Sequence, residues 1–418
     1  MRRTDTEVGQ ILPVALAILL VAGSVMLATY RTSEEASHAM VVVNAADAAA
    51  YSAGVWTARR MNLMAYSNRA MLANHIAVGH LVAYISWLRY VGTAVERVSR
   101  YARYLPYVGA AVNYARTAFN RAITAVEMGA RPLVAGLETL NKLYAAAQLD
   151  LRREVNPIHL NKIMRRVAAQ YHPRFKVNRM DATDQLPSPY AAGAKGLLFS
   201  WPMAMLGHFD TARPGRDRGY FTNLLTRTIR HDHNLARWLG GRETRWPPRY
   251  RDGRRGWSTD ILNIIRFRKQ GVTNRAPRPS AGGWRSADRL QVSFFEWDEF
   301  GWGGWSTIAS GRANAFELNR DYTGVMAYQR LTERNDAKYR FRIPALVTDQ
   351  RKPALSRGAK ADDHNPVRHA HLSVAEVAYK RPARCRPASR CPRQSDAATL
   401  FNPYWEARLI TTTDLAGS

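Results

Sequence analysis

The chain is short of cysteine, with only Cys385 and Cys391 among 418 residues, both in the stretch CRPASRC. A disulfide-rich scaffold or a four-ligand zinc site would need more cysteines than these. Two alternatives remain: one small disulfide in an oxidising compartment, or a pair of free thiols in the cytoplasm. Because Pro387 and Pro392 restrict the neighbouring backbone, we predict an intrachain disulfide between the two cysteines.

Signatures of catalysis are also missing. The sequence has no G-x-x-x-x-G-K-[ST], no H-E-x-x-H, no G-x-S-x-G and no C-x-x-C. Three groups of potential ligands or acids remain: His231, Asp232 and His233; His364, His369 and His371; Glu296, Asp298 and Glu299. His231 and His233 would point apart on a helix, and the acidic group matches no paired-carboxylate pattern. His369 and His371 could share one face of a strand near His364, but histidines near a loop are more often simply exposed. We therefore predict no metal, no cofactor and no enzymatic activity.

Acidic residues are few, 33 against 61 basic ones, so the formal net charge is +28. Only nine of the basic residues are lysines. A basic chain suggests an anionic partner such as nucleic acid, lipid headgroups or a polysaccharide. The simpler alternative is a solvated basic surface.

The charge is concentrated between Arg213 and Arg289, where 19 basic and 6 acidic residues leave a net of +13. Four tryptophans interrupt this stretch, namely Trp238, Trp246, Trp257 and Trp284. Mixed basic and aromatic surfaces can bind single-stranded nucleic acid by stacking. The alternative is a loop-rich surface whose tryptophans pack under arginine stems, and no spacing typical of a nucleic-acid-binding motif accompanies them.

Charge is absent from Ile11 to Tyr30, a run of twenty mostly apolar residues. A helix of this length spans about 30 Å, the thickness of the hydrocarbon core of a bilayer. Arg2 and Arg3 precede it, which favours a cytoplasmic N-terminus. A cleaved signal peptide is the alternative, because the stretch from Val21 to Ser24 is small enough for a cleavage site. We predict a retained membrane anchor.

Proline is nearly absent from the next segment, and Arg31 to Asp150 reads as helical. Ala46, Ala50, Gly54 and Ala58 recur every four residues and line one helix face. Together with Asn44 and Asp47 they form a helix-packing motif, which could receive either a partner helix or later segments of the same chain.

A second uncharged stretch, Ala70 to Leu88, is long enough to be another membrane span. Asn74, His75 and His80 interrupt it, and such residues are costly in lipid. We predict a single span and keep the hairpin as the alternative.

The remainder predicts an α+β fold. A short helix after Pro157 ends at Pro173, and Tyr220 to Leu239 suggests another. Aromatic and β-branched residues predict strands that form a small antiparallel sheet, at Leu290–Trp297, Trp305–Ser310, Tyr339–Val347 and Leu372–Tyr379. The expected organisation is a leader (1–10), a transmembrane helix (11–30), a helical pilin-like stalk or bundle (31–180) and a basic α+β domain outside the cytoplasm (181–418).

The N-terminal pattern resembles a known family. A polar leader ends in Gly9-Gln10, the apolar run follows, and Asn44 to Ala50 reads NAADAAA. These first 60 residues resemble the N-terminus of TadE/TadG-like Flp (tight adherence) pilus-assembly proteins. The stretches 375–379 (AEVAY) and 400–409 (LFNPYWEARL) are similar to large members of this group. The D-x-S-x-S metal pattern of some TadG-like relatives is absent here.

The resemblance implies a pseudopilin-like or minor-pilin role in a bacterial envelope, with a processing site between Gly9 and Gln10. True type IV pilins carry a glutamate at the fifth mature position. A cut after Gly9 would place Val14 there, beside Pro13, so we expect inefficient cleavage or none.

Together these patterns predict a single-pass protein of the bacterial inner membrane that acts as a structural component of a pilus-assembly system. Its expected partners are the membrane and other pilus-assembly or pilin-like proteins. The alternative function is an envelope-anchored module that holds nucleic acid or an anionic polysaccharide through its arginine- and tryptophan-rich surface.

Overall fold

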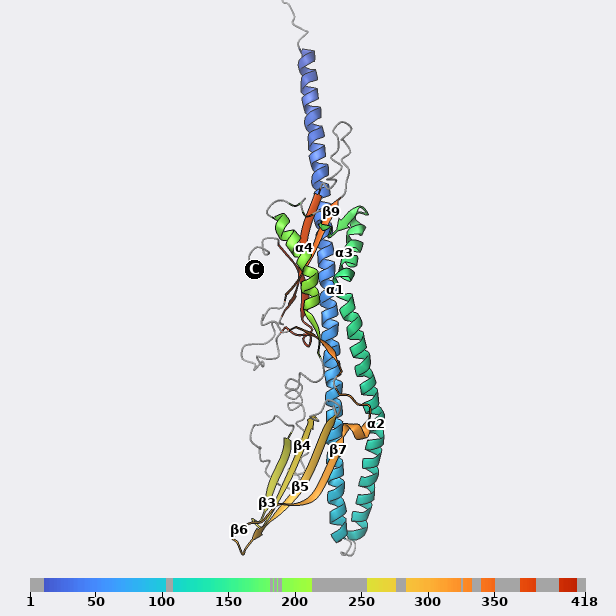
Figure 1. The fold of residues 1–418 in the computed structure, drawn as a ribbon, viewed down its shortest axis with the longest axis vertical. Coiled ribbons are helices and arrows are strands. Elements are labelled where there is room, and N and C mark those ends of the chain that lie inside the picture. Colours follow the sequence, from blue (N-terminus) through green and yellow to red (C-terminus); the bar gives the residue numbers. More distant parts are fainter. Residues whose placement is uncertain are drawn as a thin grey trace, which may run out of the picture.

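One very long helix is the axis of the molecule (Figure 1). The computed structural model describes residues 11–102, 108–180, 183, 186, 190–212, 254–275, 283–324, 326–332, 340–349, 369–380 and 398–411. Helix α1 runs over Ile11–Ala102, and its 92 residues correspond to about 138 Å at 1.5 Å per residue. The fold is α+β, as predicted, and elongated along this helix.

Helix α2 (Val108–Glu154) returns antiparallel along α1. The contacts confirm the antiparallel arrangement, because residue numbers rise along α2 as those of their partners fall along α1. The pairs are Arg89 with Glu127, Asn74 with Asn141, Ser67 with Gln148, and Arg60 with Glu154. The prediction of a long helical region is confirmed. Helix α3 (Pro157–Tyr171) follows after Asn156, whose side chain accepts a hydrogen bond from the Ile158 amide at 3.0 Å, a standard N-cap.

The sheet nearest the N-terminal end of the rod, here called the proximal sheet, is antiparallel with the order β1-β9-β10-β11. Its strands are Phe175–Val177, Arg340–Asp349, His369–Tyr379 and Trp405–Ile410. One face packs on α1 and α3, and the other packs on α4 (Tyr190–Gly207). Burial on both faces explains the continuous apolar run Ile343–Val347 in the centre of β9.

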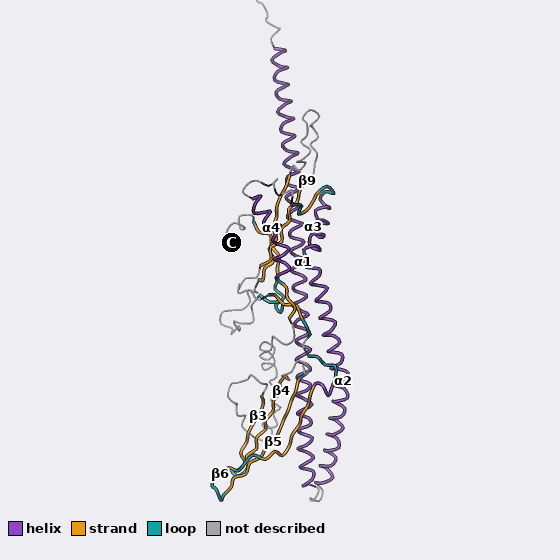
Figure 2. Tube along the Cα trace, viewed as in Figure 1, coloured by secondary structure: helices purple, strands orange, loops and turns teal. Residues whose placement is uncertain are grey.

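The sheet at the other end, here called the distal sheet, has the order β3-β4-β5-β6, with β7 also paired to β5. Its strands are Arg254–Ile261, Ile265–Arg275, Trp284–Glu296, Gly301–Trp302 and Ser306–Asn314. A short helix, α7 (Ala315–Leu318), follows β7. The strands β2 (Phe209–Ala212) and β8 (Tyr328–Leu331) form a separate pair. The sheets lie along one side of α1, and α2 runs along another (Figure 2).

Strands are found in all four predicted places, as β5, β7, β9 and β10. The expectation of a loop-rich surface between Arg213 and Arg289 is wrong for its described part, which contains the β3–β4 hairpin and the start of β5. The five arginines of β3 and β4 made these strands resemble an exposed loop in the sequence. Helix α4 was not anticipated, and the predicted helix at Tyr220–Leu239 lies outside the described residues.

The stretch from Ala70 to Leu88 lies in the middle of α1 and is largely covered by protein. Val78, Val82 and Ile85 pack with Trp284 and Tyr322 in one apolar cluster. The Trp284 indole nitrogen donates to the His75 carbonyl oxygen at 2.9 Å. Packing against α2 and the distal sheet therefore explains why this stretch carries no charge, and a second membrane span is not needed to explain it.

Candidate functional site

The N-terminal part of α1 extends beyond the rest of the protein (Figure 1). Every residue from Leu12 to Glu34 is exposed, on all sides of the helix. Among the described residues, α1 is the one helix long and apolar enough to cross a membrane. The apolar stretch of α1 that meets this criterion has no buried residue. A helix that is apolar all round normally belongs in a protein core or a membrane, and here no core surrounds it.

The polar side chains of this segment bond to its own backbone. Ser24 donates to the Val21 carbonyl oxygen, Thr29 to that of Val25 and Thr32 to that of Ala28, at 2.8, 2.8 and 2.6 Å. In hydrocarbon an unpaired hydroxyl is costly, and this internal pairing removes the cost. The uncharged part of this segment, from Leu12 to Thr29, is therefore chemically compatible with lipid.

The folded body begins directly after the apolar segment. Glu35 contacts His369 at the start of β10, with 2.9 Å between the carboxylate and the ring nitrogen. His369 was a candidate metal ligand together with His371 and His364. His364 lies outside the described residues, and within the described ranges no group of three histidine, cysteine, aspartate or glutamate side chains could hold a metal ion.

The predicted helix-packing motif lies where the proximal sheet crosses α1. Ala46, Ala50, Gly54 and Ala58 are buried, Asp47 is partly buried and Asn44 is exposed. A methyl group added at Gly54 would lie 3.0 Å from the Ala375 Cβ and 3.1 Å from the Ala407 Cβ. Small residues on both sides thus allow β10 and β11 to approach the helix closely. The motif is occupied by the chain's own strands.

The outer end of the distal sheet presents apolar side chains to solvent. The turn after β3 carries Leu262, and the turn after β5 carries Trp297 and Phe300, with exposed fractions of 85%, 64% and 83%. The two turns are adjacent, because the Phe295 amide donates to the Ile264 carbonyl oxygen at 2.8 Å. We call these exposed apolar turns, 261–264 and 297–300, the distal tip. It lies at the opposite end of the rod from the apolar segment.

Backbone strain accompanies this exposure. Leu262 and Phe300 have φ values of 52° and 46°, a region costly for large side chains. Strained, exposed apolar residues are typical of contact surfaces. Of the acidic group, Asp298 and Glu299 belong to the same turn, and Glu296 is the last residue of β5. This surface was not predicted from the sequence, although a leucine and a phenylalanine within turns were a signal for it.

The tryptophans near the distal tip are covered by arginines. The Arg266 guanidinium carbon lies 3.6 Å from the Trp302 ring centroid, and that of Arg268 lies 4.1 Å from the Trp305 centroid. Trp284 is buried against α1. Burial and the positive charge of Arg289 lower the pKa of Arg268. Trp238, Trp246 and the Trp257 side chain lie outside the described residues.

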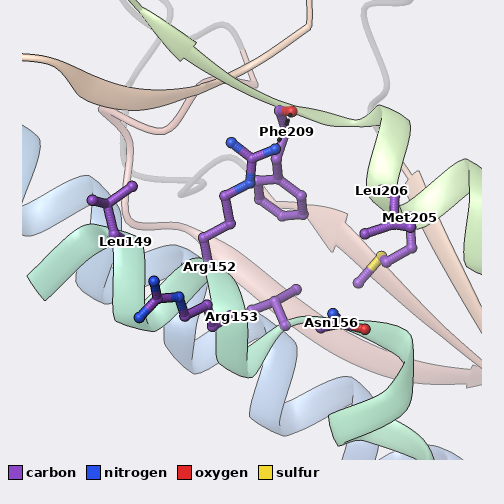
Figure 3. Close-up of a pocket in the computed structure, with 8 residues that line it drawn as sticks. Leu149, Arg152, Arg153, Asn156, Met205, Leu206 and Phe209 are labelled. Atoms are coloured by element: carbon purple, nitrogen blue, oxygen red, sulfur yellow. Dashed lines mark hydrogen bonds between the residues drawn. The ribbon is translucent and has the colours of Figure 1, made fainter.

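A pocket of about 280 Å³ lies between the end of α2, the turn into α3 and the junction of α4 with β2 (Figure 3). Arg152 and Arg153 line it with Phe209 and other apolar side chains. The Arg152 guanidinium donates to the Thr211 hydroxyl, to the Gln329 side chain and to the Phe209 carbonyl oxygen, at 3.1, 3.1 and 3.3 Å. These hydrogen bonds of Arg152 brace β2 and β8 from the wall of the pocket.

Charged groups between the distal sheet and the helices form internal braces. Arg89 on α1 donates to Glu127 on α2 and to Glu317 on α7, at 2.7 and 2.8 Å. Burial lowers the pKa of Arg89, but the hydrogen bonds and charges of the two glutamates outweigh it and raise the pKa overall. Burial, followed by the charge of Asp288, raises the pKa of Tyr90 to about 12. These groups link α1 to α2, to α7 and to the distal sheet.

Other predicted site residues lie outside the described part of the chain: Gly9, Gln10, His231, Asp232, His233, Cys385 and Cys391. Processing at Gly9 and the disulfide therefore remain predictions. Comparison of the chain with models of protein families, with curated proteins and with solved structures finds no match in any of the three.

Proposed function

We propose that the protein is a membrane-anchored, pseudopilin-like structural component of a tight-adherence pilus assembly system. In this proposal residues 11–30 span the inner membrane once, and the rod formed by the rest of the chain stands outside the cytoplasm. The role is mechanical and interactive, with no catalytic step.

The observation that carries this proposal is the division of one continuous helix. Its first part is apolar, exposed on all sides and internally hydrogen-bonded, whereas its remainder is the packed axis of the body. A rigid helix shared by anchor and body transmits force and orientation between them, which suits an assembly component. The NAADAAA resemblance supplies the specific system.

The distal tip supports the same role. It is an exposed apolar surface held at the end of the rod opposite the anchor, and such surfaces commonly mark protein contacts. Two contact ends on one stiff body favour a linking function over the alternative of holding an anionic polymer. For polymer binding, tryptophan rings would need free faces for stacking, yet an arginine guanidinium already lies over one face of Trp302 and one face of Trp305.

The test compares two substitutions of exposed apolar residues on α1. Leu19→Arg places a charge in the middle of the apolar segment and should abolish membrane retention, because a central arginine costs about 2.5–3.5 kcal/mol on insertion scales. Met40→Arg, beyond the segment and equally exposed, is the matched control and should leave retention unchanged. Each variant is expressed in a strain that lacks the native gene. The amount of protein in the membrane fraction and the number of surface pili are then measured.

The proposal expects pili to be lost with Leu19→Arg and retained with Met40→Arg. A periplasm-active reporter fused after Asp150 should be active in the wild type. Normal pili in the deletion strain would reject the pilus role. An active cytoplasmic reporter at Asp150 would reject the topology.

A further inference from the structure

The outward face of α2 carries a regular apolar stripe. Its members follow an alternating spacing of four and three residues: Ala111, Ala115, Ala118, Ala122, Ala125, Gly129, Pro132, Gly136, Thr139, Leu143 and Ala146. We call this set the outer seam. Every one of these residues is exposed. A methyl group added at Gly129 or Gly136 would meet no described atom within 4 Å.

This exposure is not a consequence of a loosely packed helix. The opposite face of α2 is well buried against the body through Ala130, Val134, Glu138, Asn141 and Gln148. Six charged residues occur between Ala111 and Ala146, and none belongs to the outer seam. A solvent-facing stripe would normally carry those charges.

Large apolar side chains flank the small ones, which is an independent sign of a contact surface. Met128, Leu133 and Leu140 lie beside the outer seam with exposed fractions of 62%, 54% and 43%. Leu143 within it exposes 60%. Small residues along a centre line with larger ones at its margins form a groove that fits another helix of the same kind.

The spacing specifies the geometry of that contact. Successive residues of the outer seam are on average 3.5 positions apart. This spacing keeps a stripe facing its partner when two helices wrap around each other in a left-handed supercoil. Alanine and glycine at these positions let the helix axes approach closely. The outer seam therefore suits a long helix and not a flat or globular partner.

We propose that a second copy of this chain occupies the outer seam, with the two α2 helices parallel and in register. The inference rests on the anchoring part of the proposed function and not on the pilus role. Two copies anchored in one membrane have rods that point the same way, so equivalent residues lie at equal depth. A two-fold axis along the membrane normal then brings each seam position against itself.

The available area suits this partner. From Ala111 to Ala146 the outer seam is about 53 Å long, and a strip about 10–12 Å wide along it covers roughly 500–650 Å² per copy. The total approaches the roughly 1,200 Å² at which specific interfaces begin. Anchoring both copies in one membrane also removes part of the translational and rotational entropy that association costs.

The test is cysteine cross-linking of the full-length protein in native membranes, with both native cysteines changed to serine. Single cysteines replace the seam residues Ala118, Ala122 and Ala125 or the exposed residues Thr117, Asn120 and Thr124 on other sides of α2. After mild oxidation we expect about tenfold more reducible dimer at the seam positions, because a disulfide requires Cβ atoms about 3.5–4.5 Å apart.

A second arm keeps Ala118→Cys as the reporter and adds a charge elsewhere. Gly129→Glu should remove the dimer, and Thr124→Glu, off the seam, should preserve it. A photo-crosslinking amino acid at Ala118 repeats the measurement with the native cysteines in place. Equal cross-linking at all positions, no dimer at the seam, or an adduct of a mass other than twice the chain would overturn the proposal, the last by revealing a different partner.

The two proposals can fail separately. Seam-specific dimers in a strain whose pili are unaffected by deletion would reject the pilus role and support self-association. If the Gly129→Glu variant loses the dimer but keeps normal pili, self-association through the outer seam is not required for fibre assembly.

Discussion

The Lys269 ammonium nitrogen lies 3.2 Å from a carboxylate oxygen of Asp288, and both side chains are almost completely removed from solvent. The Ser86 hydroxyl of α1 donates to the second carboxylate oxygen at 2.7 Å. The aspartate thus joins two strands of the distal sheet to the central helix. Both charges have lost their hydration, so each depends on the other.

Removing one member of this pair should strongly destabilise the protein. For Asp288→Ala we expect a loss of about 3–5 kcal/mol of unfolding free energy, because the Lys269 charge remains buried without its counter-ion. The control is Asp150→Ala, which breaks the exposed pair with Arg153 and should cost less than about 1 kcal/mol. Denaturant unfolding of the detergent-solubilised protein measures both. Similar losses in the two variants would contradict a buried pair.

Gly311 marks the closest approach of β7 to α1. A methyl group there would overlap the Ser86 carbonyl oxygen and the backbone of Tyr90. Because neither backbone can move independently, we expect Gly311→Ala to separate the distal sheet from α1 and to lower the unfolding midpoint sharply. Gly193→Ala in α4, where a methyl group meets nothing within 4 Å among the described atoms, should be neutral or stabilising by up to about 1 kcal/mol. Equal midpoints would refute the close contact.

Tyr90 should make the protein sensitive to alkali. Its pKa is raised from 10.0 to about 12, so between these values the unfolded state releases the phenolic proton and the folded state keeps it. The stabilising contribution is complete below pH 10 and is lost as pH rises through about 12, and a shift of this size corresponds to about 3 kcal/mol. The unfolding free energies of the wild type and of Tyr90→Phe, measured from pH 9 to 12, isolate the contribution of the Tyr90 hydroxyl. Parallel pH profiles would show that Tyr90 titrates normally.

The cysteine pair links compartment to covalent structure. If Cys385 and Cys391 form a disulfide, alkylation without reductant should label neither thiol in protein taken from intact cells. The short loop contributes modestly, on the order of 2–3 kcal/mol in the chain-entropy model. Reduction should therefore lower the unfolding midpoint only slightly. Quantitative labelling of both thiols would refute the disulfide and weaken the assignment of this segment to an oxidising compartment.

Helices and apolar strands were predictable because their signals are local. The run from Ile11 to Tyr30 predicts a helix long enough for a bilayer, and the near-absence of proline predicts the helix that continues beyond it. β9 and β10 were recognisable because each has a mostly apolar centre with β-branched residues, IPALV in β9 and VAEVAY in β10. β3 and β4 were not, because strands rich in arginine resemble exposed loops.

The sequence by itself determined that an uncharged helix precedes a basic α+β body and that alanine and glycine line its helix faces. Only the tertiary structure decided which of those faces are occupied. The stripe through Ala46 and Gly54 is covered by β10 and β11, whereas the outer seam of α2 remains exposed. Both are stripes of small residues along one helix face, and their composition does not show which of them another segment covers. The difference arises from strands more than 300 residues away, which close over one face of α1 and leave the outer face of α2 uncovered.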